Sequence, residues 1–173
     1  MAKGIAKLSV ALIALLAASC AGGIQGMHGD HASGVPTYAE GVNWHTLAEG
    51  RELARTQKKP MVVDYAVPKG CDRCDFLQDN VYSQKEIVDK INADFIPIWI
   101  NLDQSAYHMT DEEKRLGEKY DYNKDCLLLF LDHEAKVITD PEGKKFCFAE
   151  EVEPEDFNSY LDHVRTMYVP AEK

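Results

Sequence analysis

The chain has 173 residues, of which 29 are acidic and 19 basic, giving a formal net charge of −10. An acidic surface of this kind argues against nucleic acid and other polyanions as partners. Beyond the apolar N-terminal stretch, no segment of the sequence is long and apolar enough to cross a membrane.

The N-terminus has the pattern of an export signal. Lys3 and Lys7 precede a short apolar run, Leu8 to Ala18, and small residues lead from there to Cys20. The ending "LAASC" resembles a bacterial lipobox, in which the cysteine is acylated and becomes the first residue of the mature protein. We therefore expect a lipoprotein signal peptide at residues 1–19 and lipidation of Cys20. The alternative is an ordinary cleaved signal with an unrelated cysteine.

The mature chain divides by composition into a tether and a domain. Residues 20–41 are rich in Gly, Ala and Ser, which predicts a flexible tether, and residues 42–173 suffice for one domain with its own core. Without the two signal-peptide lysines, 17 basic residues remain against 29 acidic ones, a net charge of −12. His28 and His31 have metal-like spacing, but a flexible tether does not fix ligand geometry, so no metal is expected there. By resemblance to lipoprotein sorting, Ala21 implies the periplasmic side of the outer membrane.

From Trp44 onward, the hydrophobic periodicity alternates between that of helices and that of strands. We expect helices at Trp44–Gln57, Cys71–Val81, Ser83–Asn92, Asp111–Tyr120 and Pro154–Val164. We expect strands at Met61–Val67, Asp94–Asp103 and Cys126–Asp132, and one or two more within residues 133–148. Capping boxes are predicted at Ser83–Glu86 and Thr110–Glu113. This order predicts an α/β fold with a mixed central β-sheet flanked by helices.

Three stretches of the sequence resemble the thioredoxin-like superfamily. They are "KKPMVVDYAVPKGCDRC" (Lys58–Cys74), "FIPIWINLD" (Phe95–Asp103) and "KYDYNKDCLLLFLD" (Lys119–Asp132). The resemblance extends over residues 44–164, nearly the whole mature chain. A CxxC pair that follows a strand and opens a helix in an exported protein is a specific signal. The resemblance implies a thioredoxin-like fold and thiol–disulfide exchange without a cofactor.

Cys71 and Cys74 are the expected catalytic pair. Disulfide exchange requires a thiolate, and a helix N-terminus stabilises negative charge on Cys71 through its dipole and free N–H groups. Cys71 is therefore the predicted nucleophile. Cys74, one turn further along, is predicted to resolve the mixed disulfide. Between them, Arg73 favours a thiolate and Asp72 opposes it, so the sequence does not predict whether the protein oxidises or reduces its partners.

Asp64 is the third candidate catalytic residue. It lies near the end of a predicted buried strand, where an unpaired carboxylate is costly. In thioredoxin-like proteins an acid at this place assists proton transfer at the resolving cysteine, so the resemblance implies that role. The alternative is an aspartate that faces water. Seven positions separate Asp64 from Cys71, one more than usual, and a bulge around residues 68–70 would absorb the difference.

Thioredoxin-like domains usually carry a cis-proline that faces the CxxC pair, and aligning the chain on this resemblance puts Cys126 in its place; a shift of one position would put Asp125 there. One interpretation makes Cys126 a third thiol near Cys71. The other pairs it in a disulfide with Cys147 on a neighbouring strand.

Two other uses of the CxxC pair stay open. A copper(I)- or zinc-binding lipoprotein could use the same thiols, although a closed zinc site needs a second tight ligand pair that the sequence lacks. A purely structural disulfide is disfavoured because so short a loop constrains the unfolded chain little. The expected partners are thiols or disulfides of exported proteins, an unidentified redox partner, and the membrane through the lipid anchor. We expect a monomer.

Overall fold

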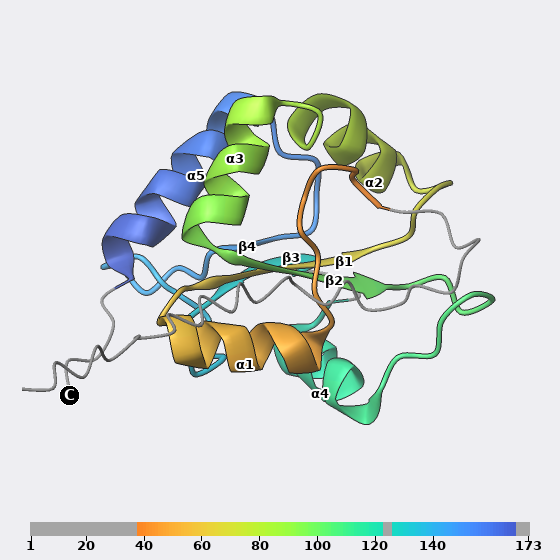
Figure 1. Cartoon of the computed structure of the whole chain (residues 1–173), viewed down its shortest axis with the longest axis horizontal. Helices are drawn as coiled ribbons and strands as arrows, with labels where there is room; N and C mark the ends of the chain where they lie inside the picture. Colours follow the sequence, from red (N-terminus) through yellow and green to blue (C-terminus); the bar gives the residue numbers. More distant parts are fainter. Residues whose placement is uncertain (1–37, 123–125, 169–173) are drawn as a thin grey trace, which may run out of the picture.

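The computed structural model describes residues 38–122 and 126–168. Figure 1 shows a central β-sheet with helices on both of its faces. The signal peptide, Cys20, His28 and His31 lie outside the described residues, so their assignments stay predictions. No helix within the two described ranges is long and apolar enough to span a bilayer.

Within the described residues, the sheet consists of β1 (Met61–Ala66), β2 (Ile96–Asn101), β3 (Leu128–Leu131) and β4 (Cys147–Phe148). The strands lie side by side in the order β2-β1-β3-β4. β2 runs parallel to β1, whereas β3 runs antiparallel to both β1 and β4. The mixed central sheet predicted from the sequence is therefore confirmed.

Central strand β1 is buried along its whole length. Its side chains alternate between the faces of the sheet, so that Val62 and Ala66 join one core cluster and Met61 and Val63 join the other. A strand covered on both faces needs a nearly unbroken apolar run, which the sequence "MVVDYA" provides. Asp64 is the one charged residue in this run, and its carboxylate therefore needs partners inside the protein.

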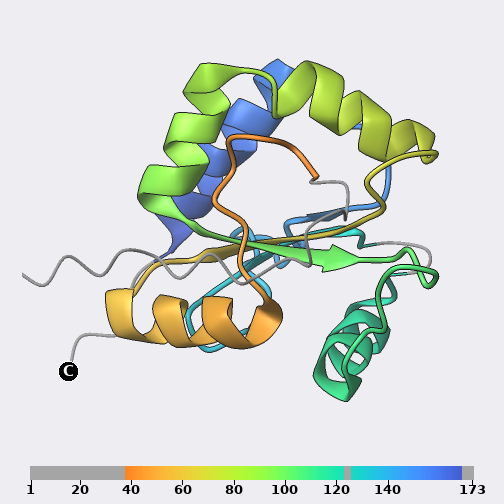
Figure 2. The same ribbon diagram turned by 45° about the vertical axis from the view of Figure 1, so that its right-hand side comes forward.

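Two layers of helices cover the sheet (Figures 1 and 2). One face carries α2 (Asp72–Phe76), its π-helical continuation η1 (Leu77–Val81), α3 (Lys85–Asp94) and α5 (Pro154–Met167). The other face carries α1 (Leu47–Gln57) and α4 (Asp111–Tyr120). Each layer encloses its own hydrophobic cluster against the sheet, because every central strand presents apolar side chains to both sides.

Of the two capping boxes predicted from the sequence, the structure shows one. Thr110 and Glu113 form the expected capping box of α4. The box predicted at Ser83–Glu86 is wrong: Gln84 is the N-cap of α3, and Ser83 Oγ donates instead to the carbonyl of Asp79 at 2.7 Å. The physical reason is that the preceding helix continues as the π-helical turn η1, which the sequence analysis missed, so Ser83 completes that helix's C-terminus.

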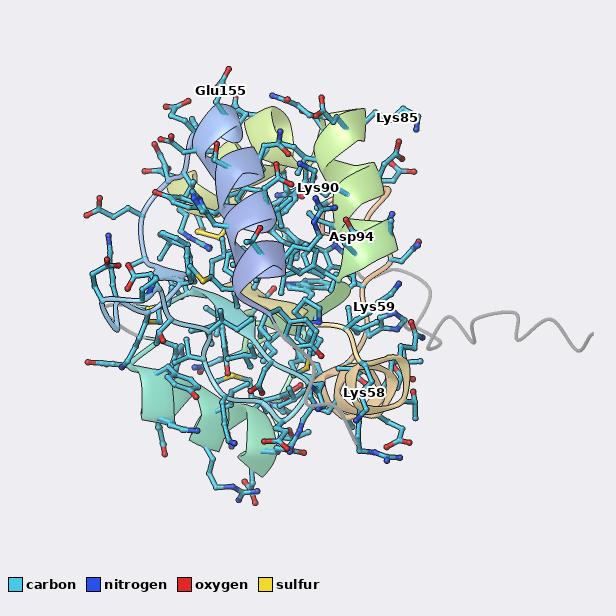
Figure 3. All side chains as sticks on the ribbon, turned by 90° about the vertical axis from the view of Figure 1, so that its left-hand side faces the viewer. Lys58, Lys59, Lys85, Lys90, Asp94 and Glu155 are labelled. Atoms are coloured by element: carbon cyan, nitrogen blue, oxygen red, sulfur yellow. A yellow bond between two sulfur atoms is a disulfide. The ribbon has the colours of Figure 1, made fainter. Side chains whose placement is uncertain are left out.

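Helices α3 and α5 lie side by side over the sheet, and Figure 3 looks onto them. Lys90 of α3 donates from Nζ to Asn158 of α5 at 2.6 Å and to Asp162 of α5 at 3.0 Å. Near the other end of the pair, Arg165 of α5 donates to Asp94 of α3 at 3.1 Å. These polar contacts fix the position of α3 relative to α5 on the face that also carries α2.

Residues 38–45 cross from the α2–α3 side of the sheet to the start of α1 (Figures 1 and 2). His45 forms a parallel β-bridge with Ile98 of edge strand β2. Tyr38 and Ala39 are only 1% and 5% exposed and belong to the core cluster on the α2 side. Tyr38 and Ala39, which fall within the range predicted as flexible tether, are thus packed against the domain, whereas Glu40 and Gly41 are exposed.

Candidate active site

Cys71 and Cys74 form a disulfide where β1 leads into α2, with their Cα atoms 5.1 Å apart. Cys71 is the N-cap residue of α2, and its sulfur accepts a hydrogen bond of 3.2 Å from the backbone N–H of Cys74. Cys71 is partly exposed, whereas Cys74 is only 2% exposed. A partner's thiol can therefore reach the sulfur of Cys71 far more easily than that of Cys74, which is the asymmetry that the predicted roles require.

Loop 67–70 connects β1 to Cys71. Gly70 adopts a left-handed conformation with φ of 81°, which glycine tolerates without strain, and the space around its Cα is open. Gln78 of η1 supports the loop by donating from Nε2 to the Pro68 carbonyl at 3.1 Å. The extra residue in the spacing, expected to form a bulge, is accommodated in this loop after β1 has ended.

Asp64 is fully buried and accepts hydrogen bonds at both carboxylate oxygens. The hydroxyls of Tyr38 and Tyr82 each donate to Oδ2 at 2.8 Å. The guanidinium of Arg73 donates from Nη2 to Oδ1 at 3.0 Å, which makes a buried ion pair. The interpretation of Asp64 as an aspartate that faces water is therefore wrong. Its predicted role in proton transfer stays a prediction.

The electrostatics of this cluster keep its donors protonated. Burial raises the pKa of the Tyr38 hydroxyl and that of Tyr82, and the charge of Asp64 raises both further. Burial lowers the pKa of Arg73, but its pKa is raised overall, chiefly through the negative charge of Asp64. Both hydroxyls and the guanidinium therefore act as hydrogen-bond donors to Asp64 across the ordinary pH range.

Arg73 lies inside the CxxC motif and yet points into the protein. It is 8% exposed, and its Nε and Nη1 atoms have no hydrogen-bond partner among the described residues. The sequence analysis treated Arg73 as a charge beside the motif and missed its pairing with Asp64. Tyr38 was missed as well, because it lies in a segment poor in apolar residues. The signal for Tyr38 was its position as an aromatic residue just ahead of the first predicted helix.

Cys126 is bonded to Cys147 in a second disulfide, with Cα atoms 4.9 Å apart. Cys126 belongs to the core cluster on the α1–α4 side of the sheet, whereas Cys74 belongs to the cluster on the other side. The prediction of Cys126 as a third thiol near Cys71 is therefore wrong, and the alternative pairing with Cys147 is the one observed. The physical reason is that β3 and β4 are antiparallel neighbours, which brings the start of β3 close to Cys147.

Replacing Cys126 and Cys147 together with alanine is expected to lower the free energy of unfolding by about 3 kcal/mol, from the closure of a loop of this length. The two cysteines are 21 positions apart in the sequence. Urea unfolding measures the stability. The rate at which the Cys71–Cys74 disulfide is opened by a small thiol should not change. A loss of that rate with unchanged stability would contradict a structural role for this second disulfide.

The metal-binding alternative from the sequence stays a prediction. In residues 38–122 and 126–168, His, Cys, Asp and Glu side chains nowhere gather in a group of three or more that could hold a metal ion. The three-thiol copper site considered from the sequence needs Cys126, whose sulfur is bonded to Cys147.

No known family model matches the sequence, and no curated protein is significantly similar to it. Among solved structures, the chain is similar to a DsbH oxidoreductase, with 18% identity, a TM-score of 0.49, and coverage of 73% of this chain and 84% of that one. It is similar to a disulphide isomerase from Xylella fastidiosa Temecula1, with 14% identity, a TM-score of 0.49, and coverage of 68% and 86%. It is similar to a thioredoxin from Thermus thermophilus, with 16% identity, a TM-score of 0.46, and coverage of 75% and 88%.

The order and direction of the strands define the fold of the chain. A parallel β1–β2 unit is followed by the antiparallel strands β3 and β4 and by the closing helix α5. The CxxC pair lies between β1 and the helix that follows it. The chain thus has a mixed α/β fold with the element order of a thioredoxin-like domain, and its CxxC disulfide lies between β1 and α2.

Proposed function

We propose that this protein is a thiol–disulfide oxidoreductase that exchanges disulfides with exported proteins while anchored by a lipid to the periplasmic side of the outer membrane. The observation that carries the proposal is the Cys71–Cys74 disulfide, with one sulfur partly exposed and the other buried, at the start of a helix. The resemblance of the N-terminus to a lipoprotein signal supports the location.

The chemistry follows from this asymmetry. A thiolate of a client protein attacks Cys71 Sγ, and a second client thiol then releases the reduced pair and leaves the client oxidised. In the opposite direction, the thiolate of Cys71 attacks a client disulfide, and Cys74 resolves the mixed disulfide. Which direction prevails depends on the reduction potential of the pair and on its electron partner.

The proposal is tested with the purified chain. We expect it to accelerate either the reduction of insulin disulfides by dithiothreitol or the oxidation of a dithiol peptide by oxidised glutathione. The matched control is the same protein after reduction and alkylation, which blocks both sulfurs of the pair. If neither reaction is faster than with the alkylated control, the proposed activity is wrong.

The direction of exchange is read from the equilibrium between the pair and glutathione. A reduction potential near that of thioredoxin, about −270 mV, would indicate a reductant, and one near about −120 mV would indicate an oxidant.

The predicted lipid anchor has its own test: radiolabelled fatty acid should be incorporated into the wild type and not into a Cys20→Ser variant. Absence of label from the wild type would leave a secreted enzyme without an anchor.

A further inference from the structure

We propose that Asp64 holds Arg73 inside the protein as a hydrogen-bond donor for the thiolate that forms on Cys74 when the disulfide opens. This inference rests on the proposed exchange at the Cys71–Cys74 pair. It makes Asp64 a positioning residue that acts through Arg73, and it gives a role to a buried cation that the disulfide-bonded site leaves only partly satisfied.

The placement of the three residues supports this role. Asp64 is on β1 between Val62 and Ala66, so its side chain projects to the face of the sheet that carries α2 and Cys74. Arg73 is the residue next to Cys74 on α2, and one nitrogen of its guanidinium is fixed by Asp64 at 3.0 Å.

The remaining nitrogens of Arg73 lack a partner. Its Nε and Nη1 atoms are buried, and no described residue accepts a hydrogen bond from either. A buried donor without an acceptor costs about 1–3 kcal/mol, and more when it carries charge. Such a side chain is stable at this place only because Asp64 compensates its charge. In the disulfide-bonded state, the three N–H groups of Nε and Nη1 are thus without an acceptor among the described residues.

The opening reaction creates an acceptor nearby. A client thiolate attacks Cys71 Sγ; a new sulfur–sulfur bond forms between client and Cys71, and the Cys71–Cys74 bond breaks. Its electron pair goes to Cys74 Sγ, which leaves as a thiolate. Because Cys74 is 2% exposed, this negative sulfur forms away from water, and without a donor it would be a poor leaving group. Nε and Nη1 of Arg73 supply the missing hydrogen bonds and the positive charge.

The hydrogen bonds of Asp64 fix its carboxylate beside Arg73. Its Oδ2 accepts from two tyrosine hydroxyls and its Oδ1 accepts from Arg73, so the carboxylate is held in place against the guanidinium. Near the Asp64–Arg73 ion pair lie the ionisable side chains of Tyr38 and Tyr82, and the first turn of α2 adds Asp72 and Asp75. Of these, Asp72 is exposed and partly screened by solvent.

The first measurement is the rate at which dithiothreitol opens the Cys71–Cys74 disulfide. This rate is measured at several pH values between about 6 and 9. We expect Arg73→Met to slow opening by about tenfold or more, because it removes a charge-assisted hydrogen bond to the leaving group. Arg73→Lys should recover part of the rate. Lys69→Met is the matched control: it removes an exposed cation of the loop before Cys71 and should leave the rate unchanged.

A second pair of variants keeps the test decisive if Arg73→Met folds poorly. Asp64→Asn combined with Arg73→Met leaves no unpaired charge and keeps an oxygen acceptor for the two tyrosines. If Asp64 only relays protons, this double variant opens at the same rate as Asp64→Asn alone. If the proposal is correct, the double variant is slower than Asp64→Asn, but by a smaller factor than Arg73→Met slows the wild type. The reason is that the amide oxygen introduced by Asp64→Asn can still accept from Arg73 and keeps part of its donation to the thiolate.

The pKa of the Cys74 thiol gives a readout that a merely structural role would not change. In a Cys71→Ser background, thiolate absorbance should show a higher pKa for Cys74 once Arg73 is replaced by methionine. An unchanged pKa together with an unchanged opening rate would overturn the inference. Because dithiothreitol replaces the client, an Arg73-dependent rate in a protein that exchanges with no client would refute the proposed function and leave this inference standing.

Discussion

Cys71→Ser is expected to reduce turnover of disulfide and dithiol substrates to the uncatalysed background, whereas Cys74→Ser should accumulate mixed disulfides with partner proteins. The physical reason is the difference in exposure: Cys71 is the sulfur that a partner reaches, and Cys74, only 2% exposed, resolves the complex from inside. Insulin reduction measures the first effect. Non-reducing electrophoresis of the protein expressed in its host measures the second.

The control for this prediction is the Cys126→Ala/Cys147→Ala variant, which removes the other disulfide and should retain turnover. Two results would contradict the assignment of roles. One is a Cys71→Ser variant that keeps substantial turnover; the other is a Cys71→Ser variant that traps partners as readily as Cys74→Ser does.

Asp64→Ala is expected to lower the free energy of unfolding by about 3–5 kcal/mol, because removing one member of a buried ion pair leaves the other charge uncompensated. Arg73 would keep its charge at 8% exposure, and the hydroxyls of Tyr38 and Tyr82 would lose their acceptor. Urea unfolding followed by circular dichroism measures the change, with the slope of the transition checked for two-state behaviour.

The matched control is Asp94→Ala, which removes the partner of Arg165 between α3 and α5. Both side chains of that pair are partly exposed, so the expected loss is about 1 kcal/mol or less. If Asp64→Ala and Asp94→Ala cost the same, the Asp64 cluster is not the buried, mutually dependent network that its hydrogen bonds indicate.

The fold and the place of the CxxC pair within it could be predicted because their signals are local. The apolar run of β1 and the stripes on the helices require only neighbours along the chain, and Thr110 and Glu113 are three positions apart. The CxxC motif is likewise recognised from the spacing of its two cysteines and from the strand that precedes it. Their interpretation did not depend on knowing which distant segments meet.

The features that the sequence analysis missed or left open depend on contacts between residues far apart in the chain. Tyr38 and Asp64 are 26 positions apart, and only the packed fold brings the hydroxyl to the carboxylate. Cys126 could have approached Cys71 or Cys147, since both pairings agree with the sequence, and the antiparallel register of β3 and β4 decides between them. Arg73 points inward because it pairs with the buried carboxylate of Asp64 on β1. No pattern within the CxxC motif reveals this pairing.

The packing of Tyr38 makes the protein's own fluorescence informative. The ring of Tyr38 lies 5.7 Å from that of Trp44 and 5.6 Å from that of Trp99, and these are the chain's two tryptophans. Tryptophan emission shifts to longer wavelength when the indole moves from an apolar environment into water. Both indoles of the chain contact Tyr38, whose hydroxyl donates to Asp64. The emission spectrum therefore reports, without an attached dye, whether the segment that carries Tyr38 is packed against the domain.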